Sequence, residues 1–242
     1  MSQLENRIKV ERENLPKHIA FIMDGNGRWA QQRKMPRSFG HNAGLDAMRR
    51  VIRFYGEVGI KVLSFYAFST ENWKRSQREV NFLMNLPIDF IEQDLPELME
   101  RGARLIYSGD LTKIPKKTLD AMRRGEKATA QNNDLIINIA FNYGGRDEII
   151  RGIRAMALEH KEGFLQALNE EDLGKFLDHP ELPDPDLIVR TGGEQRLSNF
   201  FLWQAAYSEL FFTEEYWPDL NEELLEKILG DYLDRNRRFG GL

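Results

Sequence analysis

The feature that most restricts the fold of this chain is a series of six short apolar runs separated by longer, more polar segments. The runs lie at residues 18–23, 62–68, 103–107, 135–141, 186–190 and 209–212. They are rich in Ile, Val, Phe and Tyr, as buried strands are. The alternation predicts an α/β fold with one domain over residues 1–242, in which a roughly six-stranded, mostly parallel sheet is flanked by helices. Residues 1–17 are expected to form a loosely attached N-terminal segment.

Helical periodicity is clearest over residues 45–58 and 80–98, where apolar side chains recur every three or four positions. The second repeat contains Pro87 and Pro96. Because an internal proline removes a backbone hydrogen bond, we expect a kinked or broken helix there. Further helices are expected near residues 116–131, 146–159, 170–177 and 221–235.

Composition limits the class of protein. The chain of 242 residues contains no cysteine, which excludes a disulfide framework, a thiolate metal site and a thiol nucleophile. Its longest uncharged run, residues 197–208, is too short to cross a bilayer. The first residues are too charged for a secretory signal. We therefore expect a soluble, cytoplasmic protein.

The charge balance disfavours a nucleic-acid partner. The net charge is −4, whereas binding to a phosphate backbone requires a positive face. Between Asp24 and Arg53, however, seven basic residues accompany two acids. This local excess indicates an anion site, although an exposed helix face would explain part of it.

Polar segments follow the apolar runs: DGNGR, STENWKR, SGD, NYGGR, TGGEQR and TEEYW. In an open parallel sheet, ligands bind outside the carboxyl ends of the strands. Glycine lets backbone amides approach an anion, and arginine offers a planar fork to phosphate oxygens. The combination favours a polyanionic ligand at this edge of the sheet.

The first of these segments has two interpretations. Residues 25–30 read GxGxxA, as in dinucleotide-binding folds, which would indicate a nucleotide-binding oxidoreductase. However, Pro36 and Gly40 interrupt the helix that this motif requires, and Asp46 lies well before the second strand. We favour the other interpretation, in which Asp24 binds Mg²⁺ and the following amides cradle a phosphate.

Two further segments carry candidate anion ligands with simpler alternatives. Arg37 and His41 lie beside the start of a helix that could hold an anion, but Asn42 could merely cap that helix and His41 could be a structural hydrogen bonder. Residues 69–75 gather hydroxyl, amide and guanidinium groups, of which a turn would explain the first three.

The richest candidate segment places Arg190 and Arg196 around a diglycine turn, with Ser198 nearby. A nucleophile elbow, a Walker motif and a metal-pairing histidine spacing are all absent from the sequence. The residues alone therefore predict a Mg²⁺-assisted enzyme acting on a phosphate or diphosphate ester.

Five motifs in order resemble those of the cis-prenyltransferase family, in particular its bacterial undecaprenyl diphosphate synthases. They are HIAFIMDGNGRWA, RSFGHNAG, LSFYAFSTENWKR, INIAFNYGGRDEI and DLIVRTGGEQRLSNFFLWQAAYSELFF, followed by a terminal RRFGG. The resemblance implies a homodimer whose subunits enclose a hydrophobic tunnel. It also implies repeated cis condensation of isopentenyl diphosphate onto farnesyl diphosphate, giving undecaprenyl diphosphate, a lipid carrier for the cell wall. Transient peripheral contact with the inner face of the membrane would release the product.

The resemblance assigns roles to the matching residues. Asp24 would hold Mg²⁺ on a substrate diphosphate, and Glu209 would complete the metal site across the dimer interface. The allylic diphosphate would contact Gly25, Asn26, Gly27, Arg28, Arg37 and His41, with Arg75 nearby. Isopentenyl diphosphate would contact Arg190, Arg196, Ser198 and Arg238. Ser69 and Asn72 would orient the reacting groups or move the proton, with Trp73 beside them. Trp29, Thr70 and Glu71 would complete the substrate site.

Three residues depart from the family pattern. Ser76 replaces a common proline and is expected to loosen its loop, Gln195 removes a histidine found in some members, and Phe141 is expected to narrow the tunnel. Candidate tunnel residues are Ala67, Leu83, Met84, Ile91, Leu135, Ile137 and Ile139, each of which could equally be ordinary core. Two alternatives within the family are a different product length and a non-catalytic subunit, the latter disfavoured by the intact Asp24 loop.

Overall fold

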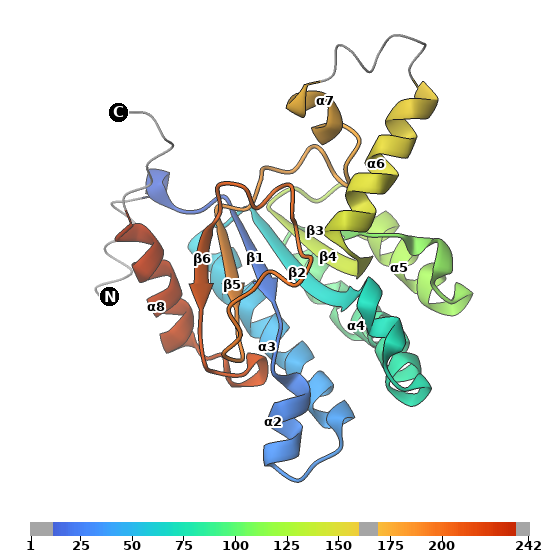
Figure 1. The fold of residues 1–242 in the computed structure, drawn as a ribbon. Helices are drawn as coiled ribbons and strands as arrows, with labels where there is room; N and C mark the ends of the chain where they lie inside the picture. Colours follow the sequence, from blue (N-terminus) through green and yellow to red (C-terminus); the bar gives the residue numbers. More distant parts are fainter. Residues whose placement is uncertain (1–11, 160–168, 236–242) are drawn as a thin grey trace.

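The sheet has six strands, all parallel, in the order β3–β4–β2–β1–β5–β6 (Figure 1). The computed structural model describes residues 12–159 and 169–235. The strands are β1 (His18–Ile22), β2 (Val62–Ser69), β3 (Ala103–Ser108), β4 (Leu135–Tyr143), β5 (Leu187–Arg190) and β6 (Glu209–Phe212). Each of them coincides with one of the apolar runs, which confirms the predicted fold class.

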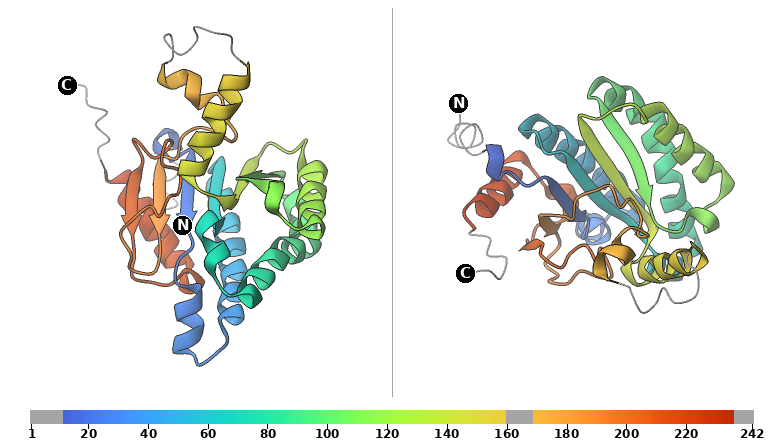
Figure 2. Two further views of the ribbon diagram at one scale, coloured as in Figure 1. Left: turned by 45° about the vertical axis from the view of Figure 1, so that its right-hand side comes forward. Right: turned by 90° about the horizontal axis from the view of Figure 1, so that it is seen from above.

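Four long helices pack on one face of this sheet (Figures 1 and 2). They are α3 (Arg37–Val58), α4 (Gln77–Glu100), α5 (Lys116–Thr129) and α8 (Glu222–Leu233). The remaining described helices are α2 (Asn26–Gln32), α6 (Gly145–Glu159) and α7 (Glu170–Gly174), with 3-10 turns η1 (Arg12–Asn14), η2 (Thr70–Lys74), η3 (Leu111–Lys113) and η5 (Trp217–Asp219). The four helices and the strand residues facing them form one continuous apolar core.

Irregular chain covers much of the opposite face, where a layer of helices was expected. Phe200 stacks on Tyr66 of β2 with ring centroids 4.6 Å apart, and on Phe201 at 4.1 Å. These rings join Ala20 and Ile188 in a second buried cluster. Large flat side chains exclude water here over a short stretch of chain, because each aromatic ring buries a large apolar area.

The helix α4 runs unbroken through Pro87 and Pro96, so the expected break does not occur. A proline removes only one hydrogen bond from the ladder, whereas the buried face of α4 contributes Leu83, Ile88 and Ile91 to the core. Burying each such side chain stabilises the fold by about 1.5–3 kcal/mol. Packing therefore outweighs the two prolines.

The start of the described chain is held more firmly than expected. Leu15 packs against the main core, and the Lys17 amide donates to an Asp186 carboxylate oxygen at 2.7 Å. Residues 1–11 lie outside the described part. Within the described ranges, no helix has the length and apolar character that a bilayer crossing requires.

A chain of buried polar side chains crosses four neighbouring strands. The His18 ring lies 2.7 Å from the Ser64 hydroxyl, Asn138 donates to that hydroxyl at 3.2 Å, and the Ser108 hydroxyl donates to Asn138 at 2.9 Å. Burial lowers the pKa of His18 to about 4, so the ring is neutral at pH 7. Each group is satisfied only when the strands pair in this register, so the chain helps to fix the register of the sheet.

We expect Asn138→Leu to lower the free energy of unfolding by about 2–3 kcal/mol, because it leaves the buried Ser108 hydroxyl without an acceptor. Urea denaturation followed by circular dichroism measures the change. Asn133→Leu, at an exposed position just before β4, is the matched control and should change stability by less than about 0.5 kcal/mol. Equal stability of the two variants would contradict the proposed role of the polar chain.

Candidate active site

The site begins where β1 and β5 end side by side. Ile22 of β1 pairs in register with Arg190 of β5, and Asp24 follows β1 by two residues. The guanidinium of Arg190, which is only 5% exposed, donates to Asp24 at 2.9 Å and to the Ser198 hydroxyl at 2.7 Å. Two residues that are 166 positions apart in the chain therefore form an ion pair at the carboxyl edge of the sheet.

Both carboxylate oxygens and the backbone carbonyl of Asp24 accept hydrogen bonds. One carboxylate oxygen accepts from the Gly25 amide at 2.6 Å and faces the Arg28 guanidinium at 3.2 Å. Its backbone carbonyl accepts from the Thr191 hydroxyl at 2.7 Å. Burial by itself would raise the pKa of Asp24, but the hydrogen bond from Arg190 and the charge of Arg28 outweigh burial and lower it. The carboxylate is therefore ionised at neutral pH.

The glycines after Asp24 serve close packing. Gly25 has a φ of +103°, and a Cβ at this position would lie 2.5 Å from the Tyr216 ring. A Cβ on Gly27 would lie 2.5 Å from the guanidinium carbon of Arg37. In addition, α2 has only seven residues. The helix after these glycines is thus shorter than the crossover helix that a dinucleotide fingerprint opens, which argues against the oxidoreductase interpretation.

A second charged group converges on Glu79, in the first turn of α4. One of its carboxylate oxygens lies 2.8 Å from Arg75, 3.3 Å from Arg37 and 3.4 Å from the His41 ring. Because α3 begins at Arg37, His41 lies inside that helix and Asn42 does not cap it. Burial lowers the pKa of His41 although Glu79 opposes the shift, so the ring is mostly neutral at pH 7.

Glu79 is a site residue that the sequence analysis missed. The only local signal is Ser76, whose hydroxyl accepts from the Glu79 amide at 3.3 Å and caps α4. A serine followed three positions later by glutamate marks a helix start and gives no sign of the two distant partners, Arg37 and His41. The same hydrogen bond gives Ser76 a role as the N-cap of α4, and the expected loosening of its loop stays a prediction.

The loop after β2 combines structural and site roles. The side-chain oxygen Oδ1 of Asn72 accepts from the Ser69 backbone amide at 3.1 Å, as a turn would require. Glu71 accepts from Asn199 at 3.0 Å, which joins this loop to the segment after β5. Trp73 points elsewhere and donates to Asn142 at 2.7 Å.

A polar pocket of about 730 Å³ lies between these groups. Its predicted lining residues are Asp24, Gly25, Asn26, Gly27, Arg28, Arg37, His41, Ser69, Glu71, Asn72, Arg75, Arg190 and Ser198. These residues come from the ends of β2 and β5, from the segments that follow β1, β2 and β5, and from the starts of α2 and α3. The structure therefore brings together most of the predicted site.

Other predicted site residues lie outside this lining. Besides Trp73, Thr70 does not reach it. Trp29 donates to Asp219 at 2.6 Å, and Arg196 is exposed and pairs with Glu194 at 2.5 Å. Arg238 lies outside the described residues, and Gln195 is exposed.

Glu209 begins β6 and pairs in register with Leu187, at the opposite edge of the sheet from Asp24. It forms an ion pair with Arg235 at 2.8 Å. Within one chain Glu209 therefore does not join Asp24. Its role in a metal site across a dimer interface stays a prediction.

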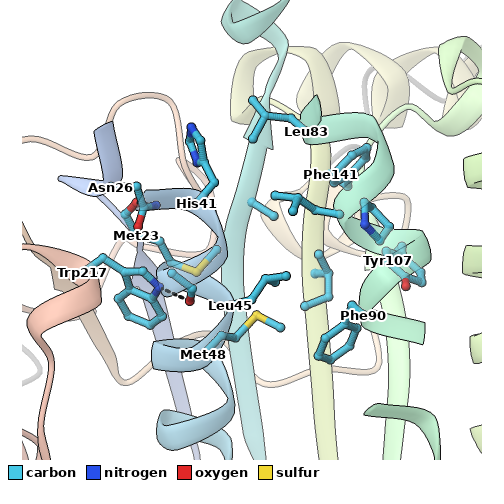
Figure 3. Close-up of a pocket in the computed structure, with 15 residues that line it drawn as sticks. Met23, Asn26, His41, Leu45, Met48, Leu83, Phe90, Tyr107, Phe141 and Trp217 are labelled. Carbon is cyan, nitrogen blue, oxygen red and sulfur yellow. Dashed lines mark hydrogen bonds between the residues drawn. The ribbon is translucent and has the colours of Figure 1, made fainter. Parts of the chain in front are cut away.

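An apolar cavity of about 70 Å³ continues from the polar pocket (Figure 3). The two share Met23, Asn26, His41, Ala67 and Leu83. Further in, the cavity is lined by Leu45, Met48, Leu86, Pro87, Phe90, Tyr107, Ile139, Phe141 and Trp217. Phe141 therefore borders this space, as expected, whereas Met84, Ile91, Leu135 and Ile137 belong to the core without lining it.

The oxygen ligands at this site suit one hard cation that takes most of its ligands from substrate phosphates and water. No group of three or more acidic or histidine side chains in the described ranges could hold a metal by itself. Asp24 offers carboxylate oxygens to the polar pocket, and Mg²⁺ is usually bound by one or two carboxylates together with substrate phosphates and water. The buried side-chain oxygen Oδ1 of Asn26, which has no hydrogen-bond partner, belongs to a residue of the same lining.

Comparison with known proteins identifies relatives of this chain. Residues 22–240 match the model of a family described as putative undecaprenyl diphosphate synthase. The chain is 49% identical to an isoprenyl transferase of Streptococcus thermophilus, over 95% of both chains, and 46% identical to one of Bacillus subtilis, over 100% of this chain and 94% of that one.

Two solved structures share the fold. A lavandulyl diphosphate synthase from Lavandula x intermedia, in complex with dimethylallyl diphosphate, has a TM-score of 0.90 and 35% identity, over 95% of this chain and 100% of that one. A probable undecaprenyl diphosphate synthase from Campylobacter jejuni has a TM-score of 0.79 and 34% identity, over 93% and 99%.

We expect Glu79→Gln to lower the pKa of His41 further, because the variant loses the carboxylate that stabilises the protonated ring. An NMR titration of the imidazole resonances measures the shift. Glu92→Gln, an exposed position on the same helix, is the control. A pKa that is the same in both variants would mean that the His41–Glu79 contact does not persist in solution.

Proposed function

Because the chain belongs to the undecaprenyl diphosphate synthase family, whose curated members here are isoprenyl transferases, we propose the reaction of this prenyltransferase in detail. It condenses isopentenyl diphosphate repeatedly onto farnesyl diphosphate, forms Z double bonds, and stops at undecaprenyl diphosphate. The reaction takes place in the cytoplasm, on a soluble enzyme that contacts the inner face of the membrane only to release its product.

The observation that carries this proposal is the direct passage from a cation-lined pocket into an apolar cavity. A prenyl diphosphate has the same two parts, a polyanionic head and a hydrocarbon tail. His41 and Leu83 border both spaces, so a bound diphosphate would direct its first isoprene unit inward. This arrangement favours a lipid diphosphate over a nucleotide.

The allylic diphosphate is proposed to lie between Arg28, Arg37 and Arg75, beside the Gly25–Gly27 loop. These guanidiniums already face the pocket, and they would stabilise negative charge as the carbon–oxygen bond breaks. The solved lavandulyl diphosphate synthase, which contains dimethylallyl diphosphate, supports an allylic diphosphate in this fold. Ser69 and Asn72, at the neighbouring strand end, would orient the reacting groups.

The second diphosphate, that of isopentenyl diphosphate, is proposed to lie toward Arg190 and Ser198. Arg190 is anchored by Asp24 and keeps a buried Nε without a hydrogen-bond partner. Arg196 is paired only with Glu194 among the contacts that the structure records. We expect the diphosphate to replace that carboxylate, which would move Arg196 into the site on binding.

Asp24 is the residue proposed to hold Mg²⁺, as its ionised carboxylate and its place in the polar pocket suggest. When bound there with a substrate diphosphate, the ion would neutralise the charge of the leaving group. Arg28 and Arg190 fix the carboxylate from two directions. This preorientation would spare the site a costly rearrangement during reaction.

We expect the purified protein, given farnesyl diphosphate, labelled isopentenyl diphosphate and Mg²⁺, to form undecaprenyl diphosphate. Asp24→Asn should lower kcat by at least about a thousandfold, since it removes the charge that binds the metal. Chelation of Mg²⁺ should abolish the reaction. Thin-layer chromatography of the dephosphorylated products measures both rate and chain length.

Asp120→Asn, an exposed position on α5, is the matched control and should keep full activity. A product ladder that stops earlier would favour the alternative of a shorter product, which the small cavity and Phe141 support. Complete inactivity of the folded wild-type protein would favour a non-catalytic subunit. Activity that survives Asp24→Asn would overturn the proposed metal role.

We propose that the enzyme is a homodimer that associates through the face around β6. Two apolar side chains are exposed at this strand and just before it: Leu210 and Tyr207. Tyr207 is 74% exposed, and β6 is an edge strand. Exposed apolar residues beside an unpaired edge are typical of subunit interfaces. The same face carries Glu209, which suits its proposed contribution to the partner's metal site.

We expect the wild-type protein to sediment as a dimer in analytical ultracentrifugation, and Tyr207→Asp to raise the dissociation constant at least tenfold, because a buried unpaired charge opposes association. Met99→Asp introduces the same charge at an exposed apolar position on α4 and should leave the dimer intact. A monomeric wild type, or equal dissociation of both variants, would contradict the proposed interface.

A further inference from the structure

The turn between α2 and α3, residues 33–36, and the first residues of α3, 37–39, form a projecting tip. Figures 1 and 2 show α2 and the start of α3 extending away from the sheet, at the opposite end of the molecule from α6. At this tip Met35 is 43% exposed and Phe39 is 56% exposed. Two large apolar side chains are thus exposed to solvent at a position where the described part of the chain leaves them uncovered.

The tip is held in place, so this exposure is a fixed property of the fold. The Met35 amide donates to the Ala30 carbonyl at 2.9 Å. A Cβ on Gly40 would lie 1.9 Å from the Asn26 carbonyl oxygen, which shows how closely α2 and α3 approach each other. The two helices therefore support the turn as a rigid hairpin.

The tip is also basic in an acidic protein. Residues 25–40 contain four basic residues and no acid, whereas the whole chain has a net charge of −4. Three of these basic side chains pair with acids: Arg28 with Asp24 at 3.2 Å, Arg33 with Asp219 at 3.1 Å, and Arg37 with Glu79 at 3.3 Å. Lys34, at the outermost turn, is exposed. The local charge is therefore positive around the two apolar side chains.

We propose that this tip docks on an anionic bilayer surface, with Met35 and Phe39 entering the boundary between headgroups and acyl chains and Lys34 facing the lipid phosphates. The inference rests on the proposed function, because a polyprenyl product must pass into a membrane. Basic and apolar side chains combined on a small convex surface suit a lipid interface. Two apolar side chains provide far less area than the about 800 Å² per partner of a stable protein interface.

The location of the tip fits delivery of a lipid. Gly27, Arg28 and Arg37 belong to the same hairpin and line the polar pocket. Docking of the tip would therefore bring the mouth of the pocket against the bilayer. Because few side chains take part, the contact is weak, reversible and sensitive to salt.

The test measures binding of the full-length protein, without substrates, to sucrose-loaded vesicles of phosphatidylcholine with or without phosphatidylglycerol. We expect binding only with phosphatidylglycerol. Met35→Ser combined with Phe39→Ser should lower it at least tenfold, as should Lys34→Glu. The control Met99→Ser changes an equally exposed methionine on α4 and should bind as the wild type does.

The proposal is overturned if the wild type does not bind these vesicles, or if the tip variants bind as well as the control. The proposal is also overturned if the tip variants lose as much turnover in detergent without vesicles as they lose with vesicles, since the tip would then act on the substrate. Vesicle binding needs no catalysis, so it can succeed when the prenyl transfer assay fails. Failure of this proposal and failure of the proposed function are thus distinguishable.

Discussion

The rest of the site depends on the ion pair between Asp24 and Arg190. A buried guanidinium is stable only beside an anion, because desolvation of a lone charge is very costly. The parallel register of β1 and β5 supplies that anion from the adjacent strand end. The pair in turn fixes where the Gly25–Gly27 loop begins and how the segment with Ser198 folds back. Local conformation and electrostatics are therefore determined together.

The site changes from polar to apolar along one face of α3 and along one face of α4. On α3, His41 is followed at helical spacing by Leu45 and Met48, all of which line the apolar cavity. On α4, Glu79 lies one turn before Leu83, with Phe90 two turns further. The polarity of the site thus changes with distance along the helix axes. A ligand with a charged head and an apolar tail would therefore be oriented by the positions of α3 and α4.

Sequence alone was enough for the strands and for placing Asp24 and Arg190 at the same edge of the sheet, because apolar runs mark buried strands and parallel strands end at one edge. It failed where the direction of a side chain matters. Trp73 and Arg196 belong to site loops yet point away from the pocket. Glu79 was missed because its partners Arg37 and His41 are about 40 residues away and only packing of α3 against α4 brings them together. The unbroken α4 likewise depends on tertiary packing that outweighs a local rule.

The polar chain of His18, Ser64, Asn138 and Ser108 lies inside the sheet, whereas the pocket is built from the loops beyond the strand ends. The residues that fix the register and those that face a ligand are therefore different sets. In evolutionary terms, one frame can be inherited while its loops diverge under separate selection. Family resemblance at 35% identity with a TM-score of 0.90, to a protein named for lavandulyl diphosphate, is the kind of divergence that this division permits.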